Sequence, residues 1–131
     1  MGLSLRTRLY AIGRAGFASL FLLGGLNKIA NFDAMLPRVE AAGLVPALFF
    51  LPATVALELG LGLALALGTR LAWQSALGLA AFTLATNAVF HRFWELSGKV
   101  AALELSLFFK NVAIAGALVA LASVERERSL G

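Results

Sequence analysis

The chain has 131 residues, no cysteine, one histidine and a formal net charge of +4. Apolar residues make up 60% of it and charged residues 14%, whereas soluble globular domains have about 45–50% and about 25%. This composition excludes an ordinary soluble domain, and the lack of cysteine excludes dithiol exchange, thiolate-held iron–sulfur clusters and thiolate zinc sites within the chain.

The basic residues stand singly at the ends of apolar runs and form no patch, so we expect membrane anchoring rather than nucleic-acid binding. One histidine alone does not make a histidine-rich metal site, so no metal is expected. The length accommodates spans of about 20 residues with short connections. The sequence therefore predicts one all-α domain over residues 1–131, an integral membrane antiparallel four-helix bundle.

The first predicted span covers residues 9–29, behind a basic start. Arg14 interrupts its apolar run and no small-residue cleavage site precedes GGLNK, so we expect a retained helix rather than a signal peptide. Residues 30–45 mix charged and apolar side chains at a spacing typical of a short helix at the membrane interface.

The second, third and fourth spans are predicted over residues 46–68, 71–90 and 103–124. The segment Gly-Thr-Arg at 68–70 predicts a tight turn, which makes the second and third spans antiparallel neighbours. The charged segment ERERSLG follows the fourth span. Because the number of spans is even, we expect both termini on one side of the membrane.

Each predicted span carries a polar side chain that hydrocarbon disfavours, and these side chains are expected to face a polar bundle interior. Arg14 precedes Lys28 by about 21 Å of helix and Glu58 follows Pro46 by about 18 Å, so the two groups are expected at similar depth. We predict an Arg14–Glu58 ion pair in a buried polar network with Asn27 and Lys28. The alternative is that Arg14 extends to the nearby headgroups.

A second polar group is predicted nearer the opposite face, as a ligand site rimmed by aromatic side chains. Its residues are Asn87, His91, Trp94, Lys110 and Asn111. Phe90, Phe93, Phe108 and Phe109 are expected to supply apolar walls. In the alternative interpretation, His91, Arg92 and Glu95 are a solvated helix end, Asn87 is an interhelical hydrogen-bonding residue, and Lys110 pairs with Glu104 or Glu95.

Small and polar residues recur at helical spacing in two spans, which predicts two inward-facing stripes. They are Ala76, Ala80, Thr83, Asn87 and His91 in the third span, and Lys110, Ala113, Ala117 and Ala120 in the fourth. A row of small residues, Gly60, Ala64 and Gly68, is expected to serve packing within the bundle or between copies of the chain.

Taken in order, four segments resemble the DoxX family of small four-helix bacterial membrane proteins: RAGFASLFLLGGLNKI (14–29), GLVPA with ALELGLGLALALGTR (43–47 and 56–70), FHRFWE (90–95) and FFKNVAIAGALVALA (108–122). The resemblance implies a bacterial cytoplasmic (inner) membrane protein with both termini in the cytoplasm. Relatives are associated with redox work, including the membrane subunit of thiosulfate:quinone oxidoreductase, although many have no assigned activity.

Three functions are compatible with these features. The first is a redox-associated membrane subunit that binds a quinone, carries no covalent cofactor and depends on a partner protein for electrons, so that the chain is not catalytic alone. The second is a non-catalytic assembly protein for a partner complex. The third is a small-solute pathway, which would require several copies because four helices enclose little space.

Overall fold

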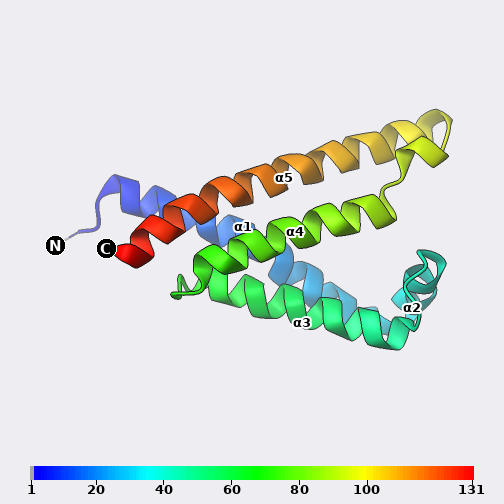
Figure 1. Ribbon diagram of the computed structural model, residues 1–131, viewed down its shortest axis with the longest axis horizontal. Helices are drawn as coiled ribbons and strands as arrows, with labels where there is room; N and C mark the ends of the chain where they lie inside the picture. Colours follow the sequence, from blue (N-terminus) through cyan, green and yellow to red (C-terminus); the bar gives the residue numbers. More distant parts are fainter. Residues whose placement is uncertain (1) are drawn as a thin grey trace.

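The computed structural model describes residues 2–131, which form helices and no strand (Figure 1). The α-helices are α1 (Leu5–Ala30), α2 (Phe32–Ala41), α3 (Ala47–Ala66), α4 (Ala72–Phe90) and α5 (Gly98–Leu130). A single 3-10 turn, η1 (Phe93–Glu95), connects α4 to α5. The all-helical prediction is confirmed.

The four long helices run in alternating directions, and both ends of the described chain lie at the same end of the molecule (Figure 1). We call this end of the molecule the termini end. The opposite end, which carries α2 and η1, is called the α2 end. Helix α1 packs on α3 and α4 packs on α5, while the short turn after α3 brings α3 beside α4. The Gly-Thr-Arg turn was therefore predicted correctly.

The main core takes residues from every long helix. Phe21 of α1, Leu65 of α3, Leu79 of α4 and Leu118 of α5 meet among small alanines. Much of the outer surface is apolar as well, with Ile12, Leu23, Leu63 and Val119 among the exposed side chains. A soluble protein buries such residues, whereas a lipid-facing surface exposes them.

Within residues 2–131, three helices are long and apolar enough to cross a membrane: α1, α3 and α5. Helix α4 is not among them, because several of its residues are polar. The structure thus supports three candidate spans, where four were predicted.

A smaller core fixes α2 against the beginning of α3. Val39 of α2 packs on Ala47 and Leu51 of α3, with Met35 and Leu44 at the edges. This helix lies within the segment 30–45 that was predicted as interfacial.

The two predicted small-residue stripes differ in outcome. In α4, Ala76, Ala80, Thr83 and Asn87 are buried as predicted. In α5, Lys110, Ala113, Ala117 and Ala120 are all exposed, so the prediction that they face inward is wrong. The buried α5 residues are Ala115, Leu118, Ala122 and Glu125.

The burial of Glu125 differs from the sequence prediction, in which this residue belongs to the charged segment after the fourth span. Helix α5 continues through this segment to Leu130, and Glu125 faces the interior.

Candidate functional site

A cleft of about 290 Å³ opens at the α2 end, between α2, α3 and α4. Its polar lining residues are Lys28, Arg38, Thr54, Glu58, Thr86 and His91. Its apolar lining residues are Met35, Val39, Leu44, Leu51, Phe82 and Phe90. The cleft therefore combines hydrogen-bonding groups with aromatic and aliphatic walls, as small-molecule sites usually do.

An ion pair between α1 and α3 lies on the wall of the cleft. Lys28 Nζ donates to both carboxylate oxygens of Glu58, at 3.0 Å to Oε1 and 2.8 Å to Oε2. The Lys28 side chain is 21% exposed and that of Glu58 only 7%. Gly24 makes room for the pair, since a Cβ at Gly24 would lie 3.3 Å from Glu58 Oε1.

The predicted Arg14–Glu58 ion pair is wrong, because each group has a different partner. The error lies in the assumed alignment of α1 and α3. Gly24 faces Glu58 and Gly68 faces Arg14, so Arg14 is level with the turn after α3. By this alignment α3 begins about 8 Å beyond the end of α1, and α2 occupies the difference. Lys28 is thereby the cation level with Glu58.

Asn27 was predicted in the same buried network but is exposed. Its side-chain oxygen and its backbone carbonyl accept hydrogen bonds from Asn31 Nδ2, both at 3.0 Å. This contact lies at the junction of α1 and α2. In the part of the chain that the structure describes, the Asn27 side chain makes no hydrogen bond to Lys28 or Glu58.

Two predicted ligand-binding residues bond to each other instead of lining the cleft. Asn87 is 1% exposed; its Nδ2 donates to the carbonyl oxygen of Phe108 at 3.0 Å, and its Oδ1 accepts from Asn111 Nδ2 at 3.2 Å. Each of these bonds crosses from α4 to α5. The geometry matches the interhelical hydrogen bond that was the alternative interpretation of Asn87.

His91 does line the cleft, at the end of α4. Its Nδ1 lies 2.6 Å from Glu104 Oε2 on α5, so the imidazole links the cleft wall to the neighbouring helix. This contact was not predicted. It places a carboxylate of α5 directly behind an imidazole that lines the cleft.

Trp94 lies outside the cleft and is 55% exposed. It packs edge-on against Phe93 and Phe108, in an aromatic cluster formed by η1 and α5. Of the four phenylalanines predicted as walls, Phe90 lines the cleft, whereas Phe93, Phe108 and Phe109 belong to this separate cluster.

Lys110 lies on the exposed face of α5, away from the cleft. Its two predicted alternative partners are engaged elsewhere, since Glu104 contacts His91 and Glu95 lies 3.5 Å from Arg92. Successive helix residues point about 100° apart, so Lys110 and Asn111 cannot both face α4. Asn111 does, and Lys110 therefore faces outward.

Sequence reasoning missed three polar residues of the cleft: Arg38, Thr54 and Thr86. Thr54 precedes Glu58 by one helical turn, which is a signal that places the two on one face. Both threonine hydroxyls donate to carbonyl oxygens of their own helices, Thr54 to Phe50 and Thr86 to Thr83, and so present acceptors to the cleft. Arg38 has no ion-pair partner within the described chain and supplies a free cation.

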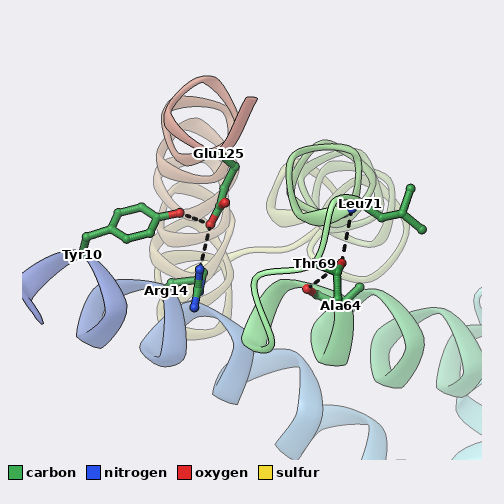
Figure 2. A network of polar contacts seen from close by, with 6 residues as sticks. All are labelled: Tyr10, Arg14, Ala64, Thr69, Leu71 and Glu125. Carbon is green, nitrogen blue, oxygen red and sulfur yellow. Dashed lines mark hydrogen bonds and ion pairs between the residues drawn. The ribbon is translucent and has the colours of Figure 1, made fainter. Parts of the chain in front are cut away.

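A second polar cluster lies at the termini end, where Tyr10 and Arg14 of α1 point toward Glu125 of α5 (Figure 2). The Tyr10 hydroxyl donates to Glu125 Oε1, and Arg14 Nη1 lies 3.5 Å from the same oxygen. Neither Tyr10 nor Glu125 was predicted in the network. The cluster joins α1 to α5, and it explains how Arg14 is accommodated without Glu58.

Beside this cluster, Thr69 holds the turn between α3 and α4 (Figure 2). Its hydroxyl donates to the carbonyl oxygen of Ala64 at 3.2 Å and accepts from the backbone N–H of Leu71 at 3.3 Å. The turn also needs Gly68, which has a φ of +63° and lies under the Arg14 guanidinium.

In the part of the chain that the structure describes, no group of three or more His, Cys, Asp or Glu side chains could hold a metal ion. The cleft at the α2 end offers cationic donors, hydroxyl acceptors and apolar walls. This set of groups is suited to binding a ligand with a small polar head.

The sequence model of the DoxX family matches residues 9–92, which is more than half of the chain. A relative, the inner membrane protein YphA of Escherichia coli (strain K12), is 28% identical over 125 residues, which cover 89% of this chain and 83% of the relative. No solved structure shows significant similarity to the chain.

Proposed function

The chain belongs to the DoxX family, and we propose that it is a four-span protein that binds a quinone or a similar lipid-soluble carbonyl compound in the cleft at the α2 end. The observation that carries this proposal is the composition of the cleft: Arg38 and the Lys28–Glu58 pair lie beside Phe82 and Phe90.

Helix α4 is the fourth span in this proposal. Its 19 residues extend about 28 Å, close to the thickness of the hydrocarbon core. Three of its polar residues, Ser75, Thr83 and Asn87, are buried against the rest of the protein and so are not exposed to lipid, whereas Gln74 is exposed in the first turn of the helix. Burial of polar groups inside a bundle makes a span of moderate hydropathy acceptable.

The size of the cleft favours a headgroup rather than a whole lipid. Its volume of about 290 Å³ lies just below the range for small-molecule sites, about 300–1,000 Å³. In this proposal a quinone ring lies between the aromatic side chains of α4 and the aliphatic side chains of α2 and α3, with its carbonyl oxygens accepting hydrogen bonds from Arg38 and Lys28. Its apolar tail would extend from the cleft into the bilayer.

In this proposal a redox partner supplies the electrons. The chain has no cysteine and no flavin or haem motif, so it binds the quinone without delivering electrons itself. Reduction to the quinol also consumes two protons, and His91 with Glu104 at the rim is suitably located to transfer them.

We assign the protein to the bacterial inner membrane, because the relative from Escherichia coli bears that location in its name. Both termini are proposed to be cytoplasmic. Arg6, Arg8, Arg70, Arg126 and Arg128 lie toward the termini end, against Lys28, Arg38, Arg92 and Lys99 toward the α2 end. This excess of five over four has the sign that the positive-inside rule requires.

The test is the quinone content of protein purified from membranes, measured after organic extraction. We expect bound quinone in the wild type and about tenfold less in Arg38→Gln, because the variant loses a charge-assisted hydrogen bond. Lys99→Gln, a change at the same end but outside the cleft, should retain the quinone. Absence of quinone from the wild type, or equal content in Arg38→Gln, would contradict the proposal.

One observation favours the second function, assembly with another membrane protein or with a second copy. Lys110 lies on an exposed face of α5 with Ala113, Ala117 and Ala120, and small residues allow close approach of another helix. Because the chain has no cysteine, Ala117→Cys provides a single site for disulfide crosslinking in membranes. A crosslinked species supports assembly through this face, and a monomer under oxidising conditions argues against it.

A further inference from the structure

We propose a second binding site, at the termini end, for the phosphate of an anionic phospholipid headgroup. It does not depend on the quinone proposal, since it lies at the opposite end of the helices. The site is a cavity of about 670 Å³ between the turn after α3 and the last residues of α5. Its lining includes Gly68, Thr69, Arg70, Glu125, Arg128 and Ser129.

The cavity carries a net positive charge. Its one acidic side chain, Glu125, already accepts hydrogen bonds from Tyr10 and Arg14, so Arg14 compensates its charge (Figure 2). Arg70 and Arg128 have no ion-pair partner among residues 2–131. Two guanidinium groups and one carboxylate therefore line the cavity, and with Arg14 beside that carboxylate the cluster holds three cationic side chains against one anionic side chain.

The geometry of arginine suits a phosphate. The planar guanidinium donates paired hydrogen bonds that match phosphate oxygens, and such bonds are stronger than those between neutral groups. Arg128 also lies over the ring of Tyr10, with 4.4 Å between its guanidinium carbon and the ring centroid. This stacking limits the orientations of the Arg128 head and preorganises it for the ligand.

The surroundings favour a lipid over a soluble phosphate ester. Trp73 lies in the first turn of α4 at this end, and the Arg126 guanidinium carbon lies 5.4 Å from its ring centroid. Tryptophan beside arginine at the end of an apolar helix is typical of the headgroup level of a bilayer. Leu67 and Leu71, which flank the turn, are exposed and offer contact to acyl chains.

The experiment is native mass spectrometry of the full chain in detergent with equal amounts of dioleoylphosphatidylglycerol and dioleoylphosphatidylcholine. We expect the wild type to retain the anionic lipid preferentially. Arg70→Gln and Arg128→Gln should each reduce this preference by about tenfold, since each removes a charge-assisted contact. Both side chains are exposed, so neither change should impair folding, and the thermal midpoint checks this.

Controls separate the site from overall charge and from soluble ligands. Arg92→Gln makes the same change of charge at the α2 end and should leave the preference intact. An equal loss of preference in Arg92→Gln, or no loss in Arg70→Gln and Arg128→Gln, would overturn the proposal. If inorganic phosphate at millimolar concentration displaces the lipid completely, the ligand is a soluble phosphate and the lipid assignment is wrong.

The double variant Arg70→Lys with Arg128→Lys separates the effect of charge from that of guanidinium geometry. Lysine keeps the charge but loses the planar pair of donors, so we expect a preference between those of the wild type and the glutamine variants. A preference equal to that of the wild type would show that charge alone attracts the lipid, and the paired guanidinium contact with phosphate would be rejected.

Discussion

Glu58 on α3 accepts hydrogen bonds from Lys28 on α1 through both of its carboxylate oxygens. This pair lies next to the small residues Gly24 and Gly25 of α1, and it forms part of the wall of the cleft. It thus contributes to the packing of α1 on α3 and to the polarity of the candidate binding site.

The first prediction concerns the contribution of this pair to the stability of the protein. Lys28→Met leaves a buried carboxylate without its partner and should lower the free energy of unfolding by about 2 kcal/mol or more. Glu58→Gln should have a similar effect, and the double variant should recover part of the loss. Equilibrium unfolding of the purified protein in detergent measures these energies, and strictly additive losses would show that the pair does not interact.

The second prediction distinguishes the two possible partners of Arg14. A double-mutant cycle of Arg14→Ala with Glu125→Ala should give a coupling energy of about 1 kcal/mol or more, because the guanidinium lies 3.5 Å from Glu125 Oε1. The corresponding cycle with Glu58→Ala should be additive, since the alignment of α1 and α3 separates Arg14 from Glu58 by about 15 Å along the helix axis. Coupling to Glu58 instead would contradict the alignment of α1 and α3 described above.

The third prediction uses the turn after α3. Gly68→Ala should destabilise the protein by about 1–2 kcal/mol, because the residue has a φ of +63° and a Cβ there would clash with the Arg14 guanidinium. Gly60→Ala is the matched control, since Gly60 lies inside α3 and its Cβ would meet nothing within 4 Å. This control should be neutral or stabilising by up to about 1 kcal/mol, because alanine favours helix.

The fourth prediction separates structural from ligand-binding polar residues. Asn87→Leu leaves the Phe108 carbonyl and the Asn111 amide without their partners, and should cost about 1–2 kcal/mol of stability. Because Asn87 does not line the cleft, the quinone content of the folded fraction should not change. Loss of quinone without loss of stability would show that Asn87 contributes to quinone binding, as the sequence predicts.

Several features could be predicted from local sequence. The apolar runs predicted the long helices, and Gly68 with its neighbours predicted the turn that makes α3 and α4 adjacent. The small and polar face of α4 was also predicted, because Ala76, Ala80 and Thr83 recur at the helical period and have no competing polar face. Each of these features depends on residues within one helix or one turn.

The polar partners depended on the tertiary structure. The partner of Glu58 is set by how far α3 is displaced along α1, and that displacement comes from the packing of α2 on Leu51 and Ala47. The inward face of α5 was ambiguous in sequence, since alanines recur on two sides and Lys110 adjoins Asn111. Contact with α4 decides that Asn111, and not Lys110, faces the interior. Axial displacement and rotation between helices are properties of the packed interface, and they leave no periodic signal within a single segment.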